Sequence, residues 1–308
     1  MDYFDLHCDT ATKLFDSDET LDRTECYVRR EYFRNFNAYG QVFAVFSKPG
    51  IPDDGCYERF FDVADSFEKK NGISFRLWRD DVTPDGNNYI LSVEDGRLIS
   101  GDISRVKKLF DRGVRILTPL WAGVTCIGGS FDTDEGLTKH GADVIKECVS
   151  LGIITDISHS SERSADEILD ICERSGAPVI ASHSDSYSVY PHPRNITDER
   201  AKRVASSGGI VGVCLHAPHL AESGADCESV FEHIDRLVSL IGERRVAVGA
   251  DFDGTDYLPR GVASQKDIYK IADVMLCHNY GEDAVHAIMY GNAFEFFKNN
   301  LPKRRIKK

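Results

Sequence analysis

Short apolar runs rich in branched residues alternate along the chain with longer stretches whose apolar positions recur at helical spacing. Eight such runs predict strands, at residues 2–7, 39–46, 88–93, 113–118, 152–158, 178–182, 209–215 and 245–250. Among the stretches between them, amphipathic helices are predicted at 57–70, 137–151, 161–174 and 228–242. An eightfold repeat of strand and helix predicts an α/β protein of the closed, parallel (β/α)8 TIM-barrel type.

The alternative to a closed barrel is an open, doubly wound parallel sheet. A G-x-G-x-x-G turn after the first strand would favour that alternative, and none follows residues 2–7. The length of 308 residues suits one barrel, and no Ser/Gly-rich linker divides the chain. We therefore expect a single barrel domain over residues 1–308, with irregular loops at 16–37 and 255–265 near its mouth.

Polar residues stand where the predicted strands end. In barrels of this type the active site is built at the carboxyl ends of the strands. Neutral imidazole and ionised carboxylate groups offer the lone pairs that bind Zn²⁺ or a similar divalent ion. The strand ends carry both kinds of group, in His7, Asp9, Glu94, His159, His183, Asp251 and Asp253.

Each histidine also has a plain structural explanation when it is taken alone. A His-x-Asp pair arises by chance, and a histidine at a strand end can be a core residue with a backbone partner. Residues two apart on a strand face the same side, so His7 and Asp9 can both point into the mouth while Cys8 turns away. His159 and His183 end adjacent strands, and each is followed by serine, which favours ligands.

The carboxylates and the arginine after the sixth strand are open to two interpretations as well. Glu94 follows an apolar strand, where a charge is costly unless it is paired, but it could be an exposed loop residue. Asp251 could begin a turn. Arg194 is either a solvated loop residue or a fork-shaped donor for a substrate carboxylate. His216 and His219 are candidates for the lining of a pocket.

Composition narrows the classes of partner. A net charge of -13 argues against nucleic-acid binding, which draws on clustered Lys and Arg. Nine cysteines without a C-x-x-C pair favour reduced thiols over disulfides. Neither a membrane-spanning run nor a secretory leader is recognisable. We expect a cytoplasmic protein that binds a small molecule and no membrane, with a solvated basic tail at 301–308.

Eight short motifs occur in order along the chain from residue 2 to residue 298: HCD, VEDG, GLTKHG, DISHSS, SHSDS, HPRNITD, VGADFDG and YGNAFEFF. In order and spacing they resemble the membrane (renal) dipeptidase family of zinc metallopeptidases. The resemblance implies an amidohydrolase-like barrel with two Zn²⁺ per chain. It also implies hydrolysis of dipeptides, including those with a C-terminal D-residue.

The same resemblance assigns the metal ligands. His7 and Asp9 would bind one zinc ion, and His159 and His183 would bind the other. Glu94 would bridge the two ions and thus belong to the catalytic groups. Two ions held together can polarise a carbonyl and make a water molecule more acidic, which is the chemistry that amide hydrolysis needs.

The resemblance assigns catalytic and substrate-binding roles too, with one departure. Asp251 would transfer protons, and Arg194, beside Asn195, would bind the C-terminal carboxylate of the substrate. Where the family carries a histidine after the fourth strand, this chain has ILTPLW and places Trp121 there. An indole N–H can donate a hydrogen bond but cannot carry charge, so Trp121 is expected to alter substrate choice.

Three alternatives to dipeptide hydrolysis stay open. The same site could cleave another small amide, such as an N-acyl amino acid or a lactam. The barrel could instead bind metal or peptide with little turnover. A two-metal site could also cleave phosphate esters, although the acidic composition disfavours this. The lipid-anchor tail of animal relatives is not implied, and a homodimer is left open.

Overall fold

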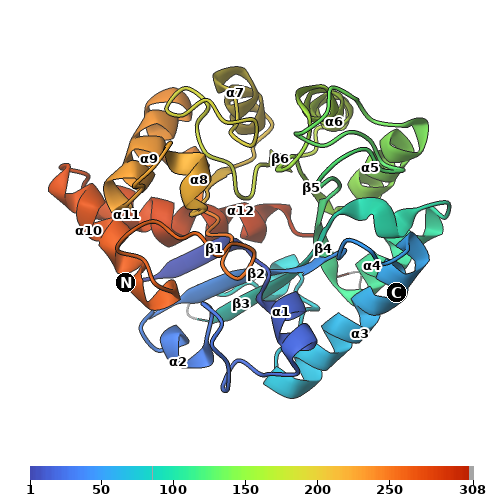
Figure 1. The fold of residues 1–308 in the computed structure, drawn as a ribbon, viewed down its shortest axis with the longest axis horizontal. Helices are drawn as coiled ribbons and strands as arrows, with labels where there is room; N and C mark the ends of the chain where they lie inside the picture. The colour runs from blue at the N-terminus through green and yellow to red at the C-terminus, as the bar shows by residue number, and fades with distance from the viewer. Residues whose placement is uncertain (85, 305–308) are drawn as a thin grey trace.

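A computed structural model describes residues 1–84 and 86–304 of the chain. Its eight strands are parallel: β1 Tyr3–Cys8, β2 Tyr39–Phe46, β3 Asn87–Glu94, β4 Val114–Thr118, β5 Ile154–Asp156, β6 Val179–Ile180, β7 Val211–Val213 and β8 Val246–Val248. They are ordered β6-β5-β4-β3-β2-β1-β8-β7, and a parallel bridge between Ala181 and Val211 joins the two ends of that order. The strands therefore close into a ring, and the predicted (β/α)8 barrel is confirmed (Figure 1).

Helices surround the strands (Figure 1). Their bounds are α1 Thr10–Ser17, α2 Arg30–Phe33, α3 Asp53–Asn71, α4 Ser104–Arg112, α5 Lys139–Leu151, α6 Glu162–Ser175, α7 Asp198–Ser206, α8 Ala217–Leu220, α9 Cys227–Ile241, α10 Tyr269–Cys277, α11 Glu282–His286 and α12 Asn292–Asn300. Short 3₁₀ turns lie at Arg79–Asp81, Gly96–Ile99, Glu243–Arg245 and Gln265–Asp267, and a π turn at Ala287–Gly291. The four helices predicted from the sequence are α3, α5, α6 and α9.

Two apolar layers hold the barrel together. The inner layer takes one or two residues from each strand or its first flank: Phe4, Leu6, Val42, Ile90, Ile116, Ile154, Ile180, Ile210 and Ala247. These residues pack with Phe294 and Phe297 of α12, and the Asn292 amide donates to the carbonyl of Val246 where β8 begins. Helix α12 thus closes the amino end of the barrel, which leaves the carboxyl end to polar groups.

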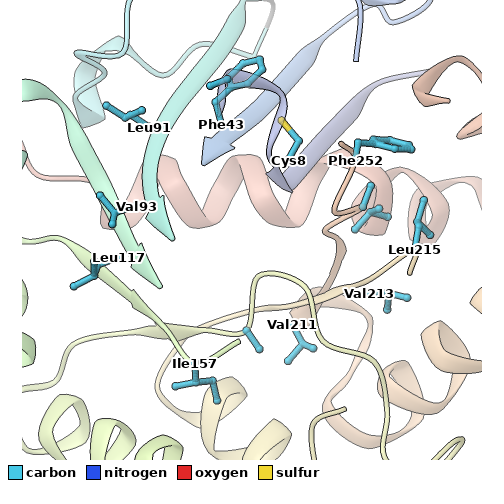
Figure 2. Packing of buried hydrophobic residues seen from close by; sticks show 14 of the residues in the cluster. Cys8, Phe43, Leu91, Val93, Leu117, Ile157, Val211, Val213, Leu215 and Phe252 are labelled. Carbon is cyan, nitrogen blue, oxygen red and sulfur yellow. The ribbon is translucent and has the colours of Figure 1, made fainter. Parts of the chain in front are cut away.

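The outer apolar layer lies between the strands and the surrounding helices. Figure 2 shows part of it, with Cys8 of β1 and Phe43 of β2 side by side. Both residues are fully buried. Because the strands and the residues next to them contribute to both layers, the ring is packed on its inside and on its outside.

The beginning of the basic tail is anchored to the barrel. Leu301 is fully buried, and the carbonyl of Pro302 accepts a hydrogen bond from the backbone N–H of Arg79 at 3.1 Å. Arg304 forms an ion pair with Asp81 at 2.6 Å. The prediction of a solvated tail is therefore wrong for Leu301, and residues 305–308 lie outside the described part of the chain.

Two structural observations bear on membrane attachment and on the state of the cysteines. No helix in the described ranges is both long and apolar enough to cross a membrane. All nine cysteines are free thiols in the structure.

Gly212 lets β7 approach β6 where the ring closes. A Cβ at this position would lie 2.0 Å from the carbonyl oxygen of Ser182 and 3.0 Å from Leu6 Cδ1. We expect Gly212→Ala to lower the free energy of unfolding by about 3 kcal/mol, because the strands must separate. Chemical denaturation measures this change.

Gly281 is the matched control, because a Cβ there meets no heavy atom within 4 Å and its φ is -68°. Gly281→Ala is expected to change the free energy of unfolding by less than about 0.5 kcal/mol. Equal stabilities of the two variants would contradict the role of Gly212.

Candidate metal centre and substrate cavity

A bulge in β1 aims the first two candidate ligands into the barrel. The pairing of β1 with β2 loses register between Asp5 and Cys8. Leu6 packs in the inner layer, whereas Cys8, two residues later, packs in the outer one. His7 and Asp9 consequently lie at the mouth of the barrel, through a bulge of the kind that re-aims side chains next to active sites.

The strand ends bring the six principal candidates together: His7, Asp9, Glu94, His159, His183 and Asp251. Glu94 lies among the histidines. Its Oε1 is 3.1 Å from His159 Nε2 and 3.8 Å from His183 Nε2, while its Oε2 is 3.5 Å from His7 Nε2. The two oxygens of one carboxylate thus face different ligand groups.

Asp9 and Asp251 complete the group around His7. Asp9 Oδ2 lies 3.5 Å from His7 Nε2, and Asp251 Oδ1 lies 3.9 Å from the same atom. His7 Nε2 and Asp9 Oδ1 are buried without a hydrogen-bond partner. Buried polar atoms without partners are rare and costly, so these atoms fit an ion that would bind to them.

Hydrogen bonds on the far side of two rings fix their tautomers. His159 Nδ1 lies 3.0 Å from the carbonyl oxygen of Trp121, which can only accept, so Nδ1 carries the proton. Ser182 donates its hydroxyl hydrogen to Asp156 Oδ2 at 2.5 Å and therefore accepts from His183 Nδ1 at 2.6 Å. Both rings present an Nε2 lone pair to the mouth, as metal-binding histidines do.

These two lone pairs meet at close range. His159 Nε2 and His183 Nε2 are 2.9 Å apart. Burial lowers the pKa of both rings, with Arg194 adding to the effect at His159 and His7 at His183. Two neutral rings with converging lone pairs repel each other unless a cation lies between them, and the donor set fits zinc.

The three carboxyl groups of the site differ in pKa. Burial raises the pKa of Asp9 to about 6, and the nearby Glu94 carboxylate adds to this. Burial also raises the pKa of Asp251 well above its usual 3.8. For Glu94 burial is outweighed by His7 and His159, so its pKa falls below the usual range. Asp251 therefore holds a proton more readily than Glu94, as a proton-transfer group requires.

The backbone is strained where it positions these groups. His159 has a φ of 67° and Asp251 a φ of 58°, both in the left-handed region that non-glycine residues seldom adopt. Next to them, a Cβ on Gly254 would lie 2.3 Å from Asp251 Oδ1 and 2.3 Å from Asp9 Oδ2. Glycine is thus needed to leave room for both carboxylates.

Asp156 is a positioning residue that sequence reasoning missed. This fully buried carboxylate accepts from the backbone N–H groups of Ser158 and Ser182 and from the hydroxyls of Thr118 and Ser182. One signal was available: a charged residue inside the apolar run 152–158 is costly unless it has partners. Through Ser182, Asp156 orients the ring of His183.

Removing the Ser182 hydroxyl tests this chain of hydrogen bonds. Ser182→Ala leaves His183 Nδ1 without its partner, so we expect zinc affinity to fall by roughly 10-fold to 100-fold, as for other partners of metal ligands. Competition with a chelator measures the affinity. Ser160→Ala is the control, because the Ser160 hydroxyl is buried without a partner. An equal loss of affinity in both variants would contradict the orienting role.

A cavity of about 520 Å³ opens over the candidate metal centre. His216 and His219 line it, as predicted, and so does Trp121. The Trp121 ring lies 4.8 Å from the ring of Phe46, measured between centroids. One wall of the cavity is therefore aromatic at the position where the resembling family carries a histidine.

Arg194 lines the same cavity as a buried cation. Its exposed fraction is 6%, and no carboxylate lies within ion-pair distance in the described part of the chain. Its guanidinium donates to the carbonyl of His183 at 3.5 Å and lies 5.6 Å from the Phe131 ring centroid. A buried cation without a counter-ion is costly, which favours an anionic ligand in the cavity.

Asn195 is held by backbone groups. Its Nδ2 donates to the carbonyls of Tyr190 and His219, both at 2.8 Å. It lines a neighbouring cavity of about 460 Å³, which shares Arg194 with the first. Its contact with substrate stays a prediction, because its amide hydrogens already connect two loops.

Comparison with known proteins gives a family and a fold. The family model described as membrane dipeptidase (peptidase family M19) matches residues 1–307. The chain is 28% identical to a Klebsiella pneumoniae protein, "uncharacterized protein in pqqA 5'region", over 68% of this chain and 81% of that one. It is 30% identical to an uncharacterized dipeptidase of Schizosaccharomyces pombe over 71% of its length, and the match spans 52% of that relative.

Two solved structures share the fold over nearly the whole length. The metallopeptidase "dipeptidase AC", of family M19, superimposes with a TM-score of 0.87 at 24% identity and covers 98% of this chain and 99% of its own. A Rhodobacter sphaeroides metallopeptidase, crystallised with a phosphinate mimic of the dipeptide L-Ala-D-Ala, gives 0.85 at 23% identity and covers 97% and 99%.

Proposed function

The chain belongs to the membrane dipeptidase family of metallopeptidases, peptidase family M19, and from this premise we propose that it hydrolyses dipeptides with two zinc ions per chain. One observation supports the proposed number of two zinc ions. Glu94 directs Oε1 to His159 and Oε2 to His7, so a single carboxylate serves two ligand groups. A carboxylate with this placement is suited to bridge a pair of ions.

The ligands divide around that carboxylate. His7 and Asp9 would hold one ion, and their buried, unpartnered atoms support this assignment. His159 and His183 would hold the other ion, with Nε2 lone pairs left free by their Nδ1 partners. Zinc bound there supplies the Lewis acidity that polarises a carbonyl and makes a water molecule a better nucleophile.

The remaining roles fall to the residues of the cavity. Arg194 would bind the substrate's C-terminal carboxylate, which restricts the enzyme to short peptides. Asp251 would accept a proton from the attacking water and pass it to the leaving amine, and its raised pKa suits both transfers. Phe46 and Trp121 would exclude water from this side of the substrate.

The experiment that tests this function combines two measurements on one sample. Metal content is determined by mass spectrometry, and hydrolysis of L,L and L,D dipeptides is measured with zinc present. Two zinc ions per chain with turnover is the expected result. A protein that binds no metal even after zinc is supplied would contradict the proposed site.

A second candidate is hydrolysis of another small amide, and Trp121 favours it. An N-acyl amino acid offers the carboxylate that Arg194 can bind and lacks a free amino group, which suits an aromatic wall. Acylated amino acids in the same assay separate the candidates, because turnover of acylated compounds alone would replace the dipeptide proposal. The dipeptide mimic in the Rhodobacter sphaeroides structure is the reason to include C-terminal D-residues.

We also infer a single catalytic domain in a cytoplasmic enzyme. The candidate ligands come from β1, β3, β5, β6 and β8 or the residues that follow them, so the site needs strands from both halves of the chain. Nine free thiols agree with a reducing compartment.

A further inference from the structure

A second group of metal-binding side chains lies beside the substrate cavity and takes no part in the function proposed above. It consists of Asp185 in the segment after β6, Cys214 directly after β7, and His219 in α8. A carboxylate oxygen, the thiol sulfur and a ring nitrogen lie within 4.8 Å of one another. His219 also lines the substrate cavity, whereas Asp185 and Cys214 are fully buried behind it.

One oxygen of the buried Asp185 carboxylate is free to bind a ligand. Asp185 Oδ1 accepts the backbone N–H of Cys214 at 3.0 Å, while Oδ2 has no hydrogen-bond partner. A fully buried carboxylate oxygen without a partner is costly, and it is the feature of this group that points to a ligand.

The other two donors are available as well. In the described part of the chain, no hydrogen bond engages the ring nitrogens of His219, whose main-chain groups bond to Asn195 and His216. Burial lowers the pKa of this imidazole, with Arg194 adding to the effect, so it keeps a lone pair at neutral pH. Cys214 Sγ accepts the backbone N–H of His216 at 3.4 Å, while burial raises the pKa of its thiol, so the proton leaves only when a cation takes its place.

We propose that Asp185, Cys214 and His219 form a separate site for a zinc-like divalent cation. Sulfur, imidazole and carboxylate donors are the set that such ions prefer. On binding, the thiol releases its proton to water, and the thiolate and carboxylate together neutralise the two charges of the ion. A neutral cluster adds no net charge beside Arg194, which lies close enough to act on Asp185.

Occupancy of this site is expected to slow the enzyme. His219 lines the cavity together with Arg194 and Asp251. The centroid of its ring lies 4.2 Å from that of the His216 ring and 4.5 Å from that of the His192 ring. Turning the ring towards Cys214 alters this stack and the shape of the substrate cavity. Zinc in excess of the proposed pair would thus act as an inhibitor.

Cobalt provides the test, because its bond to a thiolate absorbs in the near ultraviolet. The zinc-loaded enzyme is titrated with Co²⁺, and a thiolate-to-cobalt band is expected to grow until one further equivalent is bound. The predicted ligands of the zinc pair contain no sulfur, so the band does not depend on them. Absence of a band in the wild-type enzyme would overturn the proposal.

Two cysteine variants identify the sulfur. Cys214→Ser is expected to abolish the band, and Cys214→Ala provides a second variant if the first does not fold. Cys277→Ser is the control, because Cys277 is exposed and followed by His278, which makes it the obvious adventitious binder. A band that survives in both Cys214 variants, or is lost in Cys277→Ser, would overturn the assignment.

The inhibition is tested separately, and it rests on the proposed function. Each enzyme is assayed on a dipeptide at two equivalents of zinc and in excess zinc, and each is compared with its own rate. We expect a several-fold loss in the wild type and none in Cys214→Ser. Equal inhibition of both would contradict inhibition from this site. Failure of the zinc pair itself would appear earlier, as missing zinc before cobalt is added.

Discussion

Replacing Glu94 by glutamine is expected to lower dipeptide hydrolysis by more than about 100-fold, since even the partners of metal ligands contribute roughly 10-fold to 100-fold. Glutamine keeps the shape of the side chain but loses its charge and one acceptor. Only one atom of the amide can bind a cation, so the residue can no longer serve both His159 and His7. Zinc content is expected to fall from two ions per chain to one or none.

Mass spectrometry and steady-state kinetics on the same preparation measure both effects. Glu232→Gln is the control, because Glu232 is exposed on α9 and does not line the cavity over the candidate metal centre. It is expected to keep its zinc and its rate. Two zinc ions and full activity in Glu94→Gln would show that Glu94 does not bridge.

Replacing Arg194 by methionine is expected to raise KM for a dipeptide and to reduce kcat/KM by about 100-fold. The reason is the loss of a buried partner for the substrate carboxylate, which costs about 3 kcal/mol. Methionine keeps an apolar stem and removes the guanidinium, which lies near the Phe131 ring. Kinetics with a dipeptide and with its C-terminal amide isolate the effect.

The C-terminal amide shows whether the effect of Arg194→Met depends on the substrate carboxylate. It lacks the carboxylate, so the wild-type enzyme should use it poorly and Arg194→Met should use it no worse. Arg163→Met is the matched control, because Arg163 lines the neighbouring cavity, is largely exposed and pairs with Glu167. An equal loss on both substrates would mean that Arg194 supports the structure of the site and does not recognise the carboxylate.

The barrel was predictable because each strand is a short branched run and several strands begin after a glycine that ends a helix. Gly152 and Gly176 have positive φ at such helix ends. Only α3, α5, α6 and α9 were predicted, and the remaining helices have four to nine residues each, too few to show a clear helical period. The strands and the longest helices could therefore be predicted from local patterns, and the shorter helices could not.

The candidate site was predictable only in part. His7, Glu94 and His159 could be chosen because strand ends gather at one face of a barrel. Their contacts could not, since they depend on the bulge in β1 and on which oxygen of Glu94 meets which ring. Register between strands is set by the whole ring, and the sequence of one strand does not contain it.

Two buried carboxylates near the histidines were not predicted, for a similar reason. Asp156 and Asp185 are buried carboxylates whose partners come from other strands or the loops that follow them. The residues next to Asp156 and Asp185 in the sequence do not indicate that Thr118 or Cys214 is the partner. Only a general rule was available, namely that a buried charge needs a counterpart.

The pairing of β1 with β8 has a consequence for how the protein is made. Asp251 donates its backbone N–H to the carbonyl of His7 at 3.1 Å, and Asp9 donates to the carbonyl of Phe252 at 2.9 Å. His7 and Asp9 are thus held in place by residues that follow β8. During translation His7 and Asp9 are not held in place until the segment after β8 has left the ribosome, so the ion proposed for these two ligands is expected to bind only after β1 and β8 have paired.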